Sequence, residues 1–225
     1  FEPDPRTLGN PFVVIEQIAG EQLWVIYERA APGEQMQLVQ GFVARLAELH
    51  ALAPQLLEPA LSWPHSYAYI DRELAELRAD AGRSAHASLA GVVAWLERRR
   101  DTAPCARPAI LHRDYHPWNV LATVGGRLVV TDWDWRIGDP RFDLAWAIAL
   151  MRRSGFDVFA AAVQAEYARQ TRSPPGELAY FEALATLRWL LNVTHTIASE
   201  NPQRAGMRAA FREFLAEPVR RAAEL

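Results

Sequence analysis

The sequence predicts a mostly helical α+β protein with a small central β-hairpin. Half of the 225 residues are hydrophobic and 23% are charged, a balance typical of a globular protein that buries a sizeable core. Apolar residues recur at helical spacing on both sides of a central stretch of short β-type runs. The predicted order is two strands, three helices, a strand-rich centre and four helices.

Two short apolar runs at the start of the chain favour strands. Residues 11–15 and 23–27 are rich in valine, isoleucine and aromatic side chains, and turn residues separate them. We therefore assign residues 1–33 to an N-terminal pair of strands and residues 34–225 to a larger helical unit.

Helical periodicity begins at Glu34 and returns after Pro140. Apolar residues at spacings of three and four predict helices over residues 34–53, 67–77, 89–100, 142–153, 158–170, 177–198 and 207–215. Between them, the pair Gly125-Gly126 predicts a hairpin turn that joins two of the central β-type runs.

The composition excludes several classes of function. A formal net charge of −3 provides no basic field for nucleic acid or an anionic membrane, and no apolar stretch has the length of a membrane span. All 24 basic residues are arginine, so no lysine in this chain can form a Schiff base or anchor a phosphate. With Cys105 as the single cysteine, no internal disulfide forms, and we expect a reducing, cytoplasmic compartment.

A polar loop at the centre carries the strongest chemical signal. His112, Asp114 and Asn119 have the spacing His-x-Asp-x-x-x-x-Asn of the catalytic loop of kinase-type phosphotransferases, and Asp132 follows the strand after the hairpin. A carboxylate can accept the proton of an attacking hydroxyl, and Mg²⁺ prefers hard oxygen ligands. Asp114 fits the first role, and the oxygens of Asn119 and Asp132 fit the second.

Four stretches resemble the aminoglycoside phosphotransferase-like branch of the protein-kinase-like fold, which includes antibiotic, choline and fructosamine kinases. They are residues 8–16, similar to the last N-lobe strand and hinge; 46–52, similar to a helix end; 112–119, the catalytic loop; and 132–134 with 138–145, the metal site and its tail. The resemblance implies a C-terminal lobe, in which residues 1–33 are hinge and N-lobe remnant strands and residues 34–225 the helical C-lobe.

The resemblance also implies a role for each residue of the motif. Asp114 is expected to be the catalytic base, and His112 a buried organiser of its loop. Asn119 and Asp132 are expected to bind Mg²⁺ beside the phosphates of ATP. Asp143 is expected to accept hydrogen bonds from the loop.

Other expectations from the resemblance concern the nucleotide. The backbone groups of Glu16, Gln17 and Ile18 are expected to line the adenine pocket. The family's glycine-rich strands and phosphate-binding lysine lie before the hinge, so we expect this chain to be a fragment that lacks its N-lobe and is inactive alone. Arg113 stands where small-molecule kinases of this branch usually have glycine.

Several residues have plainer structural interpretations. His112, Asp114 and His116 could form a metal cluster, which we favour less because no other histidine or cysteine lies at ligand spacing nearby. Asp134 and Asp139 fit turn or cap residues.

The same holds for residues within the helices. His50 and His195 fit packing or cap residues, and residues 98–100 fit a solvated helix end. The eight tryptophans fit core residues, although Trp118 could also border the substrate cleft.

We therefore expect the whole enzyme to transfer the γ-phosphoryl group of ATP, with Mg²⁺, to a hydroxyl of a small molecule. Two alternatives stay open: a non-catalytic kinase-like binding or scaffold module, and a metal-dependent phosphohydrolase that uses the same carboxylates. The expected partners are the acceptor and the N-lobe, with no nucleic acid and no membrane. Four later acidic residues fit a cationic acceptor and solvated helix positions equally well: Asp157, Glu177, Glu182 and Glu200.

Overall fold

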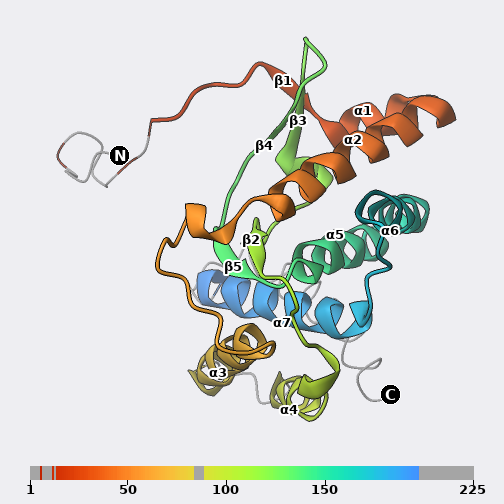
Figure 1. Cartoon of the computed structure of the whole chain (residues 1–225). Coiled ribbons are helices and arrows are strands. Elements are labelled where there is room, and N and C mark those ends of the chain that lie inside the picture. Colours follow the sequence, from red (N-terminus) through yellow and green to blue (C-terminus); the bar gives the residue numbers. More distant parts are fainter. Residues whose placement is uncertain (1–5, 7–11, 13, 84–88, 198–225) are drawn as a thin grey trace.

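The computed structural model describes residues 6, 12, 14–83 and 89–197. Figure 1 shows a small sheet and two helices at one end of a body built mainly from helices. The helices are α1 (Leu23–Arg29), α2 (Pro32–Ala51), α3 (Ala68–Arg83), α4 (Ala90–Arg98), α5 (Arg141–Arg153), α6 (Asp157–Thr171) and α7 (Leu178–Ile197). The strands are β1 (Gly20–Gln22), β2 (Ala109–Leu111), β3 (Val120–Thr123), β4 (Leu128–Val130) and β5 (Arg136–Gly138). Short 3₁₀ turns are η1 (Pro54–Leu56), η3 (Arg100–Thr102) and η4 (Pro117–Asn119).

The limits of α2 follow from its own residues. Pro32 occupies the first helical position, where a missing N–H costs nothing, and Glu34 accepts a hydrogen bond from the N–H of Ala31 (2.9 Å). The helix ends before Pro54, as predicted. The predicted helices correspond to α2 through α7, and the one expected at residues 207–215 lies outside the described residues.

The strand predicted at residues 23–27 is wrong, because this segment forms the helix α1. The ring of Trp24 stacks on that of Tyr27, with centroids 5.2 Å apart, and both rings contact Phe159 of α6. In a strand, positions three apart point to opposite faces, whereas in a helix they share one. So short an apolar run does not distinguish the two, and the aromatic contacts with α6 favour the helix.

The N-terminal strand of the structure is β1, which pairs antiparallel with β3. Gly20 approaches β3 so closely that a Cβ atom would stand 2.9 Å from the carbonyl oxygen of Ala122. Of the strand predicted at residues 11–15, Phe12 forms an isolated bridge and residues 14–15 have no regular structure. Residues 11 and 13 lie outside the described ranges.

Two small antiparallel sheets determine where the central loops lie. One has the order β1-β3-β4 and contains the predicted hairpin, with Gly126 in its turn at φ 75°; the other pairs β2 with β5. Because β3 pairs with β4 and β2 with β5, the β2–β3 and β4–β5 connections run between the same two sheets. Those connections carry residues 112–119 and 131–135.

The helices from α3 onward form the body of the molecule. α5 lies in contact with α6 and α7, and α2 packs on α6 (Figure 1). Every side chain of residues 142–148 in α5 is buried, which places this helix at the centre of the core. Within the described ranges, none of the helices combines the length and apolarity that a membrane crossing requires.

Candidate active site

The two central connections are tied together by hydrogen bonds. The N–H of Thr131 donates to the carbonyl oxygen of Asn119 (2.9 Å), and the Thr131 hydroxyl donates to the same oxygen (3.2 Å). The N–H of Asp134 donates to the carbonyl oxygen of His112 (3.1 Å). Residues far apart in the chain, from 112 to 134, therefore form one site.

Asp114 presents a carboxylate that is oriented by three donors. Its Oδ1 accepts a hydrogen bond from Trp146 Nε1 (2.8 Å) and lies 3.3 Å from His116 Nε2, while Oδ2 accepts one from Asn119 Nδ2 (3.2 Å). Burial raises the pKa of Asp114, but the hydrogen bonds from His116 and Trp146 outweigh it and hold the pKa below its usual value. With its side chain 41% exposed, this ionised carboxylate is open to a ligand.

Asn119 and Asp132 belong to two segments that are joined by the hydrogen bonds between Thr131 and Asn119. The hydrogen bonds of Asn119 Nδ2 to Asp114 orient the Asn119 side chain, because Nδ2 also donates to the carbonyl oxygen of Asp114 (3.0 Å). The Oδ1 atom of Asn119 therefore points away from Asp114. Asp132 is exposed, has a left-handed φ of 59° and directly follows Thr131, which bonds Asn119. A carboxylate plus an amide oxygen is a donor set that fits Mg²⁺.

His112 has both ring nitrogens occupied, which argues against the metal cluster with His116. Nδ1 accepts from the N–H of Asp114 (3.2 Å), so Nε2 carries the hydrogen that it donates to the carbonyl oxygen of Thr131 (2.8 Å). Burial lowers the pKa of His112, which favours this neutral form. Among the described residues, no three His, Cys, Asp or Glu side chains are grouped as a metal site.

Asp143 accepts hydrogen bonds from the loop, as the resemblance implied. Its two oxygens accept from the N–H groups of His112 and Arg113, each at 2.7 Å. His50 Nε2 lies 3.2 Å from the same carboxylate, and its Nδ1 lies 2.9 Å from the hydroxyl of Tyr167. His50 therefore does more than pack: it links α2 and α6 to the aspartate that holds the loop.

The predicted nucleotide residues lie apart from this cluster. Glu16 and Gln17 are exposed and Ile18 is half-buried, in an extended segment that leads into β1. Since β1 pairs with β3, the strand that follows the catalytic loop, this segment leads to the edge of the same sheet. Its role at the adenine, and the assignment of residues 1–33 to the hinge, stay predictions.

Aromatic rings surround Trp118, the residue before Asn119. Trp118 is half-buried, and its ring centroid lies 5.7 Å from that of Trp24, 6.5 Å from Phe156 and 5.5 Å from His116. The Trp118 ring thus packs against the core, and its place at the substrate cleft stays a prediction.

The two aspartates assigned to turns differ in burial. Asp139 is buried, accepts from the N–H of Arg141 (2.9 Å) and pairs with its guanidinium (2.6 Å). Asp134 is exposed, with an oxygen 3.6 Å from Arg113 Nε. The turn interpretation fits Asp139.

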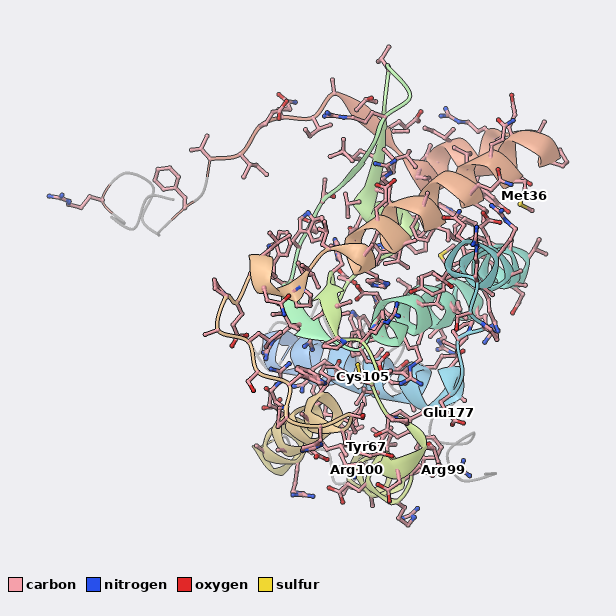
Figure 2. All side chains as sticks on the ribbon, viewed as in Figure 1. Met36, Tyr67, Arg99, Arg100, Cys105 and Glu177 are labelled. Atoms are coloured by element: carbon pink, nitrogen blue, oxygen red, sulfur yellow. The ribbon has the colours of Figure 1, made fainter. Side chains whose placement is uncertain are left out.

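The interpretation of residues 98–100 as a solvated helix end fits Arg98, which is exposed, but needs correction for Arg100. Arg100 forms two hydrogen bonds with Asp71, each of 2.7 Å, and its guanidinium lies over the ring of Tyr67 (4.1 Å). Figure 2 shows Tyr67 and Arg100 lying together near α3 and α4. Arg100, in the turn η3 that follows α4, therefore ties this turn to α3, because Asp71 belongs to α3. The side chain of His195 lies outside the described residues.

An open hollow of about 660 Å³ lies between α1, α2 and the turn of the hairpin. Its lining includes Arg29, Arg45 and Arg127, and none of the predicted site residues. The hollow is thus separate from the cluster around Asp114.

A model of the phosphotransferase enzyme family matches residues 2–181 of the chain. The chain belongs to this family. The match confirms that the resemblance carried by residues 8–145 is to a phosphotransferase family. No curated protein sequence gives a significant match.

Solved structures show the same fold. A putative aminoglycoside phosphotransferase from Ralstonia eutropha JMP134 is 18% identical, with a TM-score of 0.74 over 99% of this chain and 76% of that one. The choline kinase LicA from Streptococcus pneumoniae is 18% identical, with a TM-score of 0.60 over 96% and 70%. An ethanolamine kinase from Plasmodium vivax is 12% identical, with a TM-score of 0.55 over 93% and 63%. The predicted α+β, kinase-like fold class is confirmed.

Proposed function

We propose that this phosphotransferase uses Mg²⁺ and ATP to phosphorylate a hydroxyl group of a small molecule, with Asp114 as the base. The observation that carries the proposal is the arrangement of Asp114: an ionised, partly exposed carboxylate, oriented by three donors that include Asn119, in a loop that is hydrogen-bonded to the segment carrying Asp132. Phosphoryl transfer asks a protein mainly for positioning and for charge neutralisation, and this cluster offers both.

Each residue has a step in the proposed reaction. Asp114 binds the acceptor hydroxyl and takes its proton as the oxygen attacks the γ-phosphorus. The new O–P bond forms as the bond from the γ-phosphorus to the bridging oxygen breaks, and ADP leaves. Asn119 and Asp132 would hold Mg²⁺, which when bound neutralises charge on the phosphates.

The nucleotide part of the proposal draws on the family and on a neighbour. A structure of LicA in complex with AMP, 17% identical, aligns with 95% of this chain at a TM-score of 0.59. The chain has no lysine, whereas the family resemblance implies a phosphate-anchoring lysine before the hinge. We therefore propose that an N-terminal lobe completes the nucleotide site and that the 225 residues alone are inactive.

The proposal defines the phosphoryl acceptor only as a small molecule with a hydroxyl group. Of the later acidic residues, Glu182 pairs with Arg152 (2.9 Å), while Asp157 lies exposed in the first turn of α6. Glu177 directly precedes α7, and Glu200 lies outside the described residues. Amino sugars, choline-like amines and sugar alcohols are the acceptors to test.

The test is phosphoryl transfer by the full-length protein, with ADP release and phosphorylated product measured for each acceptor. Asp114→Asn should lower kcat by about a thousandfold or more, because the amide cannot accept the proton. Asp101→Asn is the matched control, since Asp101 is 83% exposed, and it should leave kcat unchanged. Retained turnover in Asp114→Asn would refute the assignment of Asp114 as the base.

One observation favours a second function. The absence of any lysine in these residues also fits a kinase-like binding module without catalysis. The same assay separates the alternatives: nucleotide binding without any product supports the module, and free phosphate released without an acceptor supports a phosphohydrolase.

A further inference from the structure

Arg113, which directly precedes the proposed base, has an unusual backbone conformation. Its φ is 71°, in the left-handed region that glycine adopts freely and that a side chain disfavours. This explains why related enzymes, by the resemblance, usually have glycine here. A residue with a side chain stays in this conformation only where its surroundings hold it.

The side chain of Arg113 is held by one buried carboxylate. Its Nη1 lies 3.1 Å from Oε1 of Glu73, a residue of α3 that is 0% exposed, while the Arg113 side chain itself is 4% exposed. The guanidinium also lies over the ring of Phe142, 5.0 Å from its centroid. Burial raises the pKa of Glu73, but the charges of its arginine partners outweigh it and keep the pKa below its usual value.

Glu73 is shared with a second arginine from a distant helix. Arg188 of α7 donates to Glu73 Oε2 from Nη2 (2.8 Å) and Nε (3.2 Å). Arg188 also bonds Asp80 (3.0 Å) and Glu76 (3.1 Å). Loss of the Glu73 charge would therefore leave Arg188 with two carboxylates, but would leave the buried Arg113 guanidinium with only the exposed Asp134, 3.6 Å away.

We propose that Glu73 is a positioning residue for the catalytic loop. Through Arg113 it holds the backbone beside Asp114 in the left-handed conformation, and through Arg188 it ties this loop to α3 and α7. The inference rests on the proposed function, in which Asp114 is the base. Asp114 makes one hydrogen bond to the acceptor in the proposed reaction, and the nucleotide is bound elsewhere. Because a displaced base loses proton transfer while most groups that bind the substrates stay in place, Glu73 acts mainly on kcat and little on KM.

The first test is Glu73→Gln in the full-length protein, which removes the charge and keeps the size. We expect kcat to fall about tenfold or more, with KM for nucleotide and acceptor within about twofold. Adding Arg113→Gly should restore most of the lost kcat, because glycine adopts the left-handed conformation freely and no unmatched guanidinium is left beside the loop. The second change does not replace the carboxylate that Arg188 has lost. A restored kcat would therefore show that Glu73→Gln lowers kcat through Arg113.

A matched pair tests the same inference without touching Glu73. Arg113→Gly and Arg113→Ala both remove the guanidinium, but only alanine is strained at a φ of 71°. We expect Arg113→Gly to keep kcat within about twofold of the wild type and Arg113→Ala to lose about fivefold or more. If Glu73→Gln does not fold, the difference in kcat between Arg113→Gly and Arg113→Ala tests the inference by itself.

Three results would overturn the inference: wild-type kcat in Glu73→Gln, a double variant no faster than the single one, or equal kcat in Arg113→Gly and Arg113→Ala. A lower melting temperature without a change in kcat would give Glu73 a purely structural role. Asp114→Asn in the same series separates the two claims. Transfer that depends on Asp114 but not on Glu73 refutes this inference alone, whereas no transfer by the wild type refutes the proposed function.

Discussion

Charged residues are buried beside the catalytic loop but exposed at the N-terminal helices. Beside the loop, Glu73 and Asp143 are both 0% exposed, and every bond they accept comes from an arginine, a histidine or the loop backbone. At α1, the pair of Arg29 and Glu21 is exposed on both sides, at 62% and 47%. Removing a buried acceptor leaves its donors unmatched, whereas water replaces a lost surface partner. The same chemistry therefore stabilises the loop strongly and the surface weakly.

The largest expected effect tests this contrast directly. Asp143→Ala removes the acceptor of two buried backbone N–H groups and the partner of His50, so we expect the free energy of unfolding to fall by about 3–5 kcal/mol. Urea denaturation followed by circular dichroism measures it. Glu21→Ala, the surface counterpart, should cost about 0.5 kcal/mol or less. Similar losses in both variants would contradict the comparison.

Two glycines extend the contrast from charge to packing. A Cβ atom on Gly138 in β5 would stand 2.3 Å from a ring carbon of Tyr69, so Gly138→Ala should cost about 1–3 kcal/mol. Gly91 in α4 has nothing within 4 Å of such an atom, and Gly91→Ala should stabilise the protein by about 0.5–1 kcal/mol, because alanine favours a helix. Thermal melts of both variants give the two signs, and a stabilised Gly138→Ala would show that the ring moves without cost.

The smallest expected effect concerns pH. The pKa of Glu73 is lowered in the folded state, so its contribution to stability is complete above the ordinary carboxyl range and is lost as the pH falls through the folded pKa. Between about pH 5 and pH 3, the free energy of unfolding should therefore fall less steeply in Glu73→Gln than in the wild type. Urea denaturation at each pH measures the slopes, and equal slopes would mean that Glu73 titrates alike in both states.

The site residues that the sequence predicted share a local sequence pattern, whereas the residues that it missed are joined to the site only by contacts in the folded protein. The spacing of His112, Asp114 and Asn119 is a local pattern, and Asp132 directly follows Thr131, which bonds Asn119. The sequence was therefore sufficient to propose these residues as one group. Trp146, which donates to Asp114, stands in an apolar run that buries it on all sides, and nothing in that run marks its N–H as a partner.

Glu73 did carry a signal that could have been used. It lies three residues after Ile70 and next to Leu74, on the apolar stripe of α3 that faces the core. A carboxylate on such a stripe implies a buried cation. Its partners, Arg113 and Arg188, are 40 and 115 residues away, and no local pattern names them.

The sequence by itself determined the helices from α2 to α7, the central hairpin and the residues of the catalytic motif, because periodicity, turn glycines and motif spacing are local properties of the chain. Only the tertiary structure decided that residues 23–27 form a helix, that Arg113 adopts a left-handed backbone, and that Glu73 pairs with it. Each of these depends on contacts with distant elements, whose burial sets the energy of the pairing and of the local conformation.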